Sequence, residues 1–224
     1  MKANSYEIEI KCLLGNRENA EQLEARMRAI DPNLRKIGAH KQLNHYFEGK
    51  GDFPKIAELL ENKEERAAFI DLTQKARDLS LRTRDADGKV ILVLKAAIDD
   101  TTSANGTARR ELEKTLSIPL AELDKTILDA GFSYQAKWSR ERTEYVLQGV
   151  NVTIDKNAGY GYLAEFEIIE SDASRAEEAK TKLRKLIKEV GLEELDQQRL
   201  GRMFAHYNEH WREYYGTDKI FVIE

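Results

Sequence analysis

Apolar and charged residues alternate one by one in several stretches of this chain, which is the pattern of β-strands whose two faces meet different surroundings. In the first stretch, YEIEIKCLL, the charged residues Glu7, Glu9 and Lys11 alternate with apolar ones. The same pattern recurs in the segments 79–85, 90–96, 108–116, 138–147, 151–155 and 162–170. The chain is therefore predicted to contain an extensive β-sheet.

Other stretches place apolar residues three or four positions apart, which is the spacing of an amphipathic helix. Leu23, Met27 and Ile30 follow this spacing in one of them. Another lies between Asp172, a good N-cap, and Gly191, a good helix stop. The predicted helices are 17–30, 54–78, 119–130, 173–190 and about 198–215. Each has one apolar stripe and one charged, solvated face.

One face of the predicted strands carries almost only charged residues. Fourteen positions, seven basic and seven acidic, lie on it: Glu7, Glu9, Lys11, Arg82, Arg84, Lys95, Arg109, Glu111, Glu113, Arg140, Arg142, Asp155, Glu165 and Glu167. A sheet with one face in water also alternates apolar and polar residues, although such a face normally mixes Thr, Ser, Gln and Lys. The other interpretation is a closed barrel with a polar interior and helices over its apolar outside. Buried charges of this number must pair or receive ions, so such an interior would suit a polyanion with divalent cations.

The composition limits the function. Among 224 residues, 36 Lys and Arg face 40 Asp and Glu, so the net charge is −4, and this near balance argues against a general nucleic-acid binder. The single cysteine, Cys12, excludes an intrachain disulfide framework and a cysteine-based zinc site. No signal-peptide pattern is present, and no apolar run approaches the roughly 20 residues of a membrane span. We therefore expect a cytoplasmic protein with no membrane partner.

Charged motifs follow one another along the chain in a recognisable order. The segment 7–11 reads E-x-E-x-K. Later segments read Q-x-N-x-Y-F (42–47), L-R-x-R (81–84), a strand-ending lysine (Lys95), R-x-E-x-E (109–113), R-x-R-x-x-Y (140–145) and D…G-x-G…E-x-E (Asp155, Gly159, Gly161, Glu165, Glu167). In this order they resemble the CYTH-domain proteins, the triphosphate tunnel metalloenzymes. The resemblance covers about residues 5–190, and Arg140 stands where the family pattern has Lys.

The resemblance implies an α+β fold, an eight-stranded antiparallel β-barrel that forms a tunnel surrounded by helices, and so favours the charged-interior interpretation. Residues 1–195 would form the tunnel domain, with a helical insertion at about 48–78. Residues 196–224 would form a C-terminal helical extension packed on the same domain, with a closing helix and a short edge strand.

The resemblance also implies an activity, the hydrolysis of a small-molecule triphosphate (inorganic, thiamine or nucleoside triphosphate) that depends on Mg²⁺ or Mn²⁺. One alternative is an adenylate cyclase of the same fold, which makes cyclic AMP and pyrophosphate from ATP. A second is a non-catalytic binder of polyphosphate or nucleotide. The protein would be a monomer or a homodimer.

The signs of the charges and the resemblance together assign roles to the residues on the charged face. The residues expected to bind the phosphates are Lys11, Arg82, Arg84, Lys95, Arg109, Arg140 and Arg142. The candidate metal ligands are Glu7, Glu9, Glu111, Glu113, Asp155, Glu165 and Glu167. Among all of these, the residues expected to act in catalysis are Glu7, Glu9, Lys11, Glu165 and Glu167.

A few other features receive a structural interpretation. His206 and His210 have a spacing that can chelate zinc, but no third ligand is evident, so they are predicted to be ordinary helix residues. Gly159 and Gly161 are predicted to form a turn, and 99–107 a loop at a tunnel mouth. His45, Tyr46 and Phe47 are expected to pack rather than to stack on bases, given the acidic balance of the chain, and Cys12 is expected to fill the core.

Overall fold

The computed structural model describes residues 6–75, 78–97 and 108–224. The predicted loop at 99–107 lies outside these residues. The eight strands are β1 (Tyr6–Gly15), β2 (Arg35–Glu48), β3 (Asp78–Ala86), β4 (Lys89–Ala97), β5 (Ala108–Leu116), β6 (Ser133–Leu147), β7 (Val150–Asn157) and β8 (Gly161–Glu170). All seven segments with alternating residues lie in strands, and the motif at 42–47 lies in β2.

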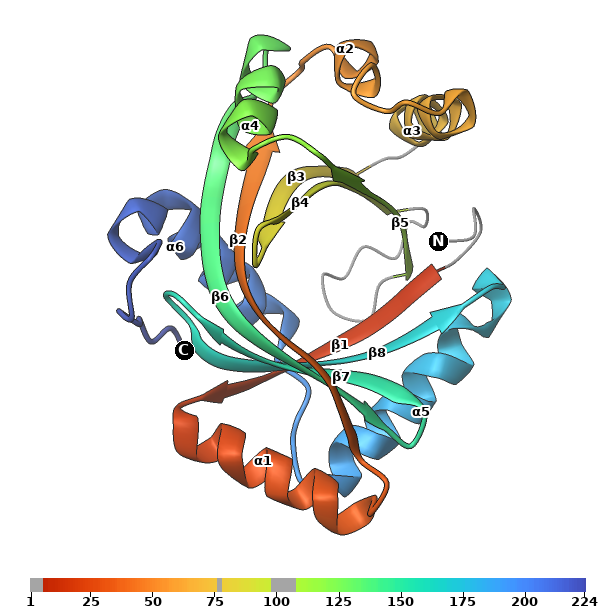
Figure 1. The fold of residues 1–224 in the computed structure, drawn as a ribbon. Helices are drawn as coiled ribbons and strands as arrows, with labels where there is room; N and C mark the ends of the chain where they lie inside the picture. Colours follow the sequence, from red (N-terminus) through yellow and green to blue (C-terminus); the bar gives the residue numbers. More distant parts are fainter. Residues whose placement is uncertain (1–5, 76–77, 98–107) are drawn as a thin grey trace.

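The strands form a closed antiparallel barrel in the order β1-β5-β4-β3-β2-β6-β7-β8. Figure 1 shows them arranged as a ring with the helices outside it. The ring closes at β1, which pairs with β8 along most of its length, and with β5 through Glu7 opposite Arg109 and Ile8 opposite Ala108. The predicted α+β barrel with surrounding helices is confirmed.

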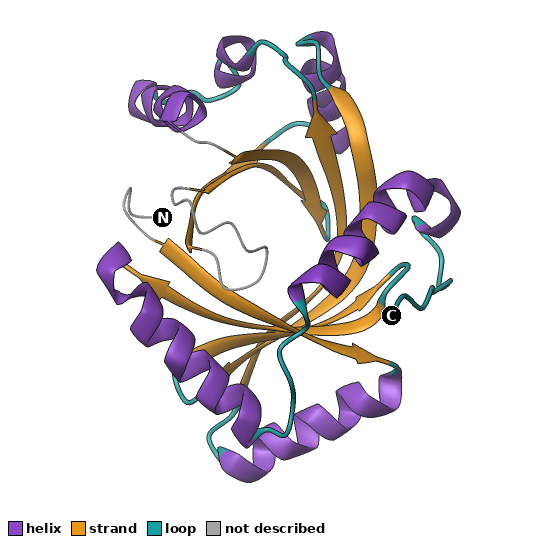
Figure 2. Cartoon of the chain, turned by 180° about the vertical axis from the view of Figure 1, so that it is seen from behind, coloured by secondary structure: helices purple, strands orange, loops and turns teal. Residues whose placement is uncertain are grey.

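The helices lie on the outside of the barrel (Figures 1 and 2). They are α1 (Arg17–Ile30), α2 (Phe53–Ala57), α3 (Lys63–Lys75), α4 (Leu120–Asp129), the 3₁₀ turn η1 (Ala173–Arg175), α5 (Ala176–Glu189) and α6 (Gln197–Tyr214). The α-helices form two groups, one of α1 and α5 and one of α2, α3 and α4, while α6 lies apart from both. Helices α1 and α5 flank β1 and β8, whereas α2, α3 and α4 lie near β3 and β4. None of the described helices is long and apolar enough to cross a membrane.

The prediction of one continuous helix over 54–78 was wrong, because the chain forms two helices there. The first ends at Ala57, and the second begins at Lys63. Asn62 lies between them, and its Oδ1 accepts a hydrogen bond from the backbone N–H of Glu64 at 2.7 Å. An asparagine side chain competes in this way with helical backbone hydrogen bonds, which favours a new helix start over continuation.

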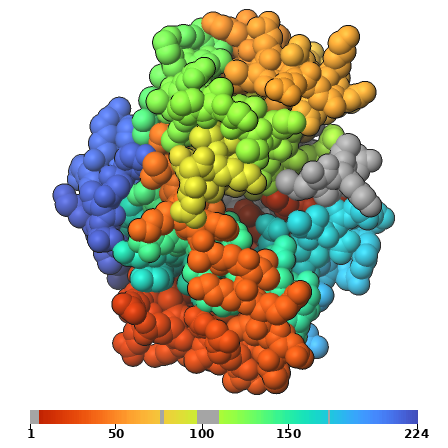
Figure 3. All heavy atoms as spheres, in the orientation of Figure 1, coloured from red at the N-terminus to blue at the C-terminus, as the bar shows by residue number. Residues whose placement is uncertain are grey.

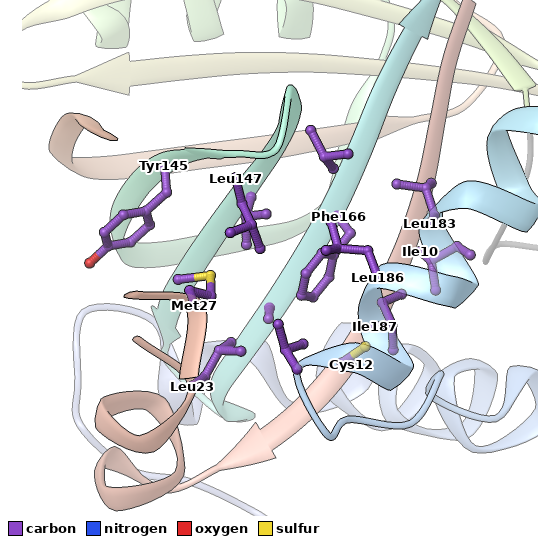
Figure 4. Close-up of a cluster of buried hydrophobic side chains, with 14 of the residues drawn as sticks. Ile10, Cys12, Leu23, Met27, Tyr145, Leu147, Phe166, Leu183, Leu186 and Ile187 are labelled. Atoms are coloured by element: carbon purple, nitrogen blue, oxygen red, sulfur yellow. The ribbon is translucent and has the colours of Figure 1, made fainter. Parts of the chain in front are cut away.

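The alternation of β1 separates the hydrophobic core from the barrel interior. Ile8, Ile10 and Cys12 face outward and are buried under α1 and α5, where they pack with Leu23 and Leu183 among others (Figure 4). The prediction that Cys12 fills the core is confirmed, since it is 1 % exposed. A second cluster lies under α2, α3 and α4 and includes Leu81, Leu92, Phe69 and Leu123. The charged residues between the outward-facing ones are thereby directed into the barrel.

The C-terminal segment packs on β6 and on the turn between β7 and β8. Leu200, Met203 and Tyr207 of α6 are buried against Trp138 and Tyr160. In the space-filling view of Figure 3, α6 and the tail after it (blue) form one side of the molecule. The short edge strand expected in this tail is reduced to one parallel bridge between Ile220 and Gly159.

The predicted turn at Gly159 and Gly161 is confirmed, and both glycines have positive φ angles, +85° and +74°. A Cβ atom at Gly161 would collide with the carbonyl oxygen of Gly15, and one at Gly159 would lie 2.6 Å from the Tyr207 ring. Only glycine combines this backbone conformation with such close approach. The turn therefore fixes where β8 begins, and with it the register of Glu165 and Glu167.

Candidate functional site

The charged strand positions come together on the inner face of the barrel. Directly opposed residues of neighbouring strands share a face of the sheet. Five such pairs are Glu7–Arg109, Glu9–Glu167, Lys11–Glu165, Lys95–Glu111 and Arg142–Asp155. A cavity of about 390 Å³ lies inside, and ten of the fourteen charged residues line it: Glu9, Lys11, Arg82, Arg84, Lys95, Arg140, Arg142, Asp155, Glu165 and Glu167.

Three of the other four charged residues contact residues that line this cavity. Glu7 and Glu111 both contact Lys95, at 2.9 and 3.1 Å from its Nζ. Glu113 contacts Arg84, with 2.7 Å between Oε1 and Nη1. Arg109 is placed through its backbone pairing with Glu7.

Acidic groups concentrate around Lys95. Burial, together with the neighbouring Glu111, raises the pKa of Glu7 to about 7, although Lys95 opposes the shift. Burial and the negative charges of Glu7 and Glu9 raise the pKa of Glu167 to about 7. The amide of Asn151 donates a long hydrogen bond of 3.4 Å to Glu167. Glu7, which is buried, and Glu167, which is half-buried, are therefore carboxyl groups that the neighbouring bases neutralise incompletely.

A second group joins two arginines to buried carboxylates. Arg142 donates to Asp155 through Nε at 2.7 Å and through Nη2 at 2.6 Å, and its Nη2 also lies 2.6 Å from Glu165. Arg140 reaches the same Asp155 with Nη1 at 3.0 Å. Burial alone would raise the pKa of Glu165, but Lys11 and Arg142 hold it well below its usual value. Asp155 is fully buried, so its carboxylate fixes both guanidinium groups in place.

Lys11 links Glu165 to the acidic group. Its Nζ lies 2.6 Å from Glu9 Oε1 and 3.3 Å from Glu165 Oε1. Burial disfavours the charged form of Glu9, but the charges of Lys11 and Lys95 and the hydrogen bond from Lys11 together outweigh burial and lower the pKa of Glu9 to about 2. Near pH 7, Glu9 is therefore ionised, whereas its opposed neighbour Glu167, with a pKa of about 7, is only partly ionised.

Arg82 and Arg84 project from alternate positions of β3. Arg84 donates through Nε to Asn44 Oδ1 at 2.8 Å, and Arg82 donates through Nε to Ser80 Oγ at 2.8 Å. The Arg82 guanidinium lies 4.3 Å from the centre of the Tyr46 ring. Each arginine is thus oriented by an uncharged partner and keeps other N–H groups for a ligand.

Comparison with family models identifies residues 5–200 as a CYTH domain. This chain belongs to the CYTH family. The match covers all eight strands and extends into the first residues of α6. No curated protein matches the sequence.

Solved structures share the CYTH fold with this chain at low sequence identity. A conserved hypothetical protein from Pyrococcus furiosus is 23 % identical, with a TM-score of 0.63 over 85 % of this chain and 93 % of its own. A putative adenylate cyclase from Vibrio parahaemolyticus is 16 % identical, with a TM-score of 0.57 over 84 % and 89 %. A putative adenylyl cyclase from Hippeastrum, described as having a dominant triphosphatase activity, is 19 % identical, with a TM-score of 0.51 over 89 % and 95 %. At these identities the likeness concerns the fold.

The structure adds cavity residues that the sequence patterns did not identify. Tyr46 was expected only to pack, but it lines the CYTH cavity, where the guanidinium groups of Arg82 and Arg140 outweigh burial and lower its pKa. Trp138 lines the cavity too, and its position two residues before Arg140 could have indicated the same face. Phe204 and Asn208 of α6 also line it, and no strand pattern could have indicated them.

His45 and Phe47 are buried outside the cavity, as expected. The ring of His45 is held by Asp124, with 2.6 Å between Nδ1 and Oδ2, and by the Tyr215 hydroxyl, 2.8 Å from Nε2. The rings of His206 and His210 lie 4.6 Å apart between centres on α6, tilted by 35° to each other. In the described part of the chain, no three His, Cys, Asp or Glu side chains are grouped closely enough to hold a metal ion as they stand.

Proposed function

We propose that this CYTH protein hydrolyses a triphosphate in the charged barrel cavity, with the help of a divalent metal ion. The observation that carries the proposal is the cavity itself, about 390 Å³ in volume and lined by basic and acidic side chains in near balance. Burying so many charges is costly unless each has a partner. A polyanion for the bases and a cation for the carboxylates would supply those partners.

The basic residues would hold the phosphates. Arg82, which donates only through Nε to Ser80, can offer two parallel N–H groups to phosphate oxygens, which is stronger and more specific than one contact. Arg84, Arg140 and Arg142 each donate to a carboxylate already and would bind phosphate through their remaining N–H groups. Lys11 and Lys95 would add point charges, and Arg109 is proposed to join them. Phosphoryl transfer depends mainly on positioning and electrostatic stabilisation, so these residues could carry much of the catalysis. No Ser or Cys nucleophile is needed.

The acidic residues around Lys95 would hold the metal. Carboxylate oxygens are the ligands that Mg²⁺ and Mn²⁺ prefer. Glu7 and Glu167, whose raised pKa values mark incomplete neutralisation, fit this role together with Glu9, and Glu111 lies beside them. Bound there, a divalent ion would supply Lewis-acid polarisation of phosphoryl oxygens. Glu113, held by Arg84, remains a candidate ligand.

Asp155 and Glu165 also remain candidate ligands by type, but their contacts favour another role. Both accept hydrogen bonds from Arg142, and Asp155 accepts one from Arg140 as well. We assign to them the positioning of these arginines for phosphate binding. In this proposal a metal ion has no need to displace the two guanidinium groups.

An assay with a panel of substrates tests the proposal. Inorganic triphosphate, thiamine triphosphate and ATP would be incubated with Mg²⁺ or Mn²⁺, while orthophosphate, pyrophosphate and cyclic AMP are measured. Metal-dependent orthophosphate release, lost in Glu9→Gln, is the expected result. Formation of cyclic AMP and pyrophosphate from ATP would show that the protein is a cyclase and not a hydrolase. Binding without turnover at any metal concentration would indicate a non-catalytic binder.

A further inference from the structure

The cavity has a second, uncharged wall. Its residues come from β6, from β8 and the turn before it, and from α6: Trp138, Tyr160, Leu163, Leu200, Phe204 and Asn208. The Phe204 ring lies edge-on to Trp138 at 5.9 Å and close to Tyr160 at 6.0 Å between centres. Inorganic triphosphate offers only charged oxygens and would leave this wall without a ligand group.

Two polar atoms in this wall have no hydrogen-bond partner among the described residues. They are Trp138 Nε1 and the Tyr160 hydroxyl. Both side chains are more than nine-tenths buried, with exposures of 8 % and 6 %, and both line the cavity. Buried polar groups in native proteins are nearly always paired, so two orphans in one wall call for an explanation. A ligand with ring nitrogens or exocyclic polar groups would provide the missing partners.

The uncharged wall lies next to the phosphate-binding arginines. Trp138 and Arg140 occupy alternate positions of β6, which places them on the same face about 7 Å apart. The ring of Tyr46 lies 6.0 Å from that of Trp138 and directly under the Arg82 guanidinium. One ligand could therefore contact the wall with one end and the arginines with its phosphates.

We infer that this wall binds an uncharged heteroaromatic group joined to the triphosphate, so that the substrate class is the nucleoside triphosphates. The inference rests on the proposed function for the phosphate end of the cavity. Aromatic side chains stack on any base, and because Trp138 already stacks on Tyr207 at 3.6 Å between ring centres, we assign the stacking to Phe204. The amide of Asn208 offers both a donor and an acceptor to a base edge. None of the six wall residues is acidic, so the wall itself offers no carboxylate to a cationic ring; Asp78, at the start of β3, also lines the cavity but is not one of them. The cavity volume also lies in the range of sites that enclose organic ligands, roughly 300–1,000 Å³.

The test compares ATP and GTP with inorganic triphosphate in the wild type and in Phe204→Ala. In the wild type, kcat/KM with Mg²⁺ is expected to be higher for a nucleoside triphosphate than for inorganic triphosphate. Phe204→Ala is expected to lower kcat/KM about tenfold for ATP and GTP, as loss of a stacking surface does, and to change the value for inorganic triphosphate less than twofold. Phe204→Leu keeps most of the side-chain volume and serves as a second test variant in case Phe204→Ala does not fold. Trp211→Leu is the matched control, since Trp211 is an aromatic residue of α6 outside the cavity lining.

Calorimetric binding of ATP and of inorganic triphosphate to the metal-free protein separates this inference from the proposed function. If no triphosphate is hydrolysed, the proposed function fails, but tighter binding of ATP that weakens in Phe204→Ala still supports the wall. Preference for inorganic triphosphate in both rate and affinity would overturn the inference. So would equal losses for ATP and inorganic triphosphate in Phe204→Ala.

Discussion

Glu9 of β1 and Glu167 of β8 lie directly opposite each other on the inner face of the barrel. Two like charges in this position repel. The protein separates them electrostatically, because Lys11 lowers the pKa of Glu9 to about 2, whereas burial and the charges of Glu7 and Glu9 raise that of Glu167 to about 7. Near neutral pH the pair is therefore only partly ionised, and a bound cation would shift it to full ionisation.

The pH dependence of stability should report this raised pKa. The folded protein keeps the proton of Glu167 up to about pH 7, whereas the unfolded chain releases it near 4.5. The stability contributed by Glu167 is thus present below pH 4.5 and is lost as the pH rises through 7. Glu167→Gln should match the wild type at pH 4 and exceed its free energy of unfolding at pH 8 by roughly 3 kcal/mol at most. Urea denaturation without divalent metal measures this, and an unchanged difference across the pH range would refute it.

Removal of the metal ion should lower the melting temperature of the protein, because the ion is proposed to bind Glu167 and the carboxylates beside it. Mg²⁺ that binds the folded protein raises its melting temperature by mass action. We expect a clear rise for the wild type at pH 8 and a much smaller one for Glu167→Gln, because one ligand and one negative charge are lost. Calorimetric scans with EDTA and with Mg²⁺ check this, with Glu18→Gln on the exposed face of α1 as control. Equal Mg²⁺ effects in all three proteins would exclude Glu167 as a ligand.

Arg84→Ala should weaken phosphate binding. The side chain is 13 % exposed, faces the cavity and is oriented by Asn44 and Glu113. Loss of a charge-assisted contact costs about 1.5–3 kcal/mol, which corresponds to a rise of about 10- to 150-fold in KM or Kd for triphosphate. Arg28→Ala, which removes an exposed ion pair with Glu24 on α1, is the control and should leave both values unchanged. Unchanged kinetics in Arg84→Ala would argue against a role in phosphate binding.

Asp155→Asn should reduce stability more than any surface charge change. The substitution removes the carboxylate that Arg140 and Arg142 share and leaves Arg142 with Glu165 alone, and breaking such an ion pair at a buried carboxylate costs about 3–5 kcal/mol. A bound polyanion would restore part of the lost neutralisation. Inorganic triphosphate should therefore stabilise Asp155→Asn more strongly than the wild type in urea denaturation. A stability loss below about 1 kcal/mol would contradict this arrangement.

Tyr215→Phe should loosen the end of α6 from the barrel. The Tyr215 hydroxyl contacts His45, whose ring is held by Asp124, and Asp124 also accepts hydrogen bonds from Thr83 and Tyr134. Loss of the outermost hydrogen bond should cost about 1 kcal/mol. Hydrogen exchange should increase in α6 before it does in the strands. Tyr162→Phe on β8 serves as control, and identical exchange of α6 in both variants would show that Tyr215 does not anchor the helix.

The alternation along β1 shows how far the sequence could lead. Glu7, Glu9 and Lys11 could be assigned to one face from spacing alone, because a strand has a period of two. The same logic reached β3, β5 and β8, and with the order of the motifs it gave the barrel. The contacts of these side chains were not predictable from spacing. Lys95, for example, pairs with both Glu7 and Glu111, which lie on different strands, and only the closed barrel brings both of them within reach.

The break between α2 and α3 had a local cause that the apolar spacing concealed. The stripe of Ile56, Leu59, Leu60 and Ile70 fits one helix, but Asn62 starts a second one by bonding to the backbone. Asp155 shows the opposite situation. Its type made it a candidate metal ligand, and the arginines on the neighbouring strand gave it a different partner.

The sequence by itself determined the strands, the separation of apolar and charged faces and the set of fourteen charged positions, because these follow from local periodicity. Only the tertiary structure decided which charges neutralise one another and which carboxyl groups remain poorly compensated. It also decided that Phe204 and Asn208 of α6 join Trp138 at the cavity. Distances between residues remote in the chain depend on strand register and helix docking, and no local pattern encodes them.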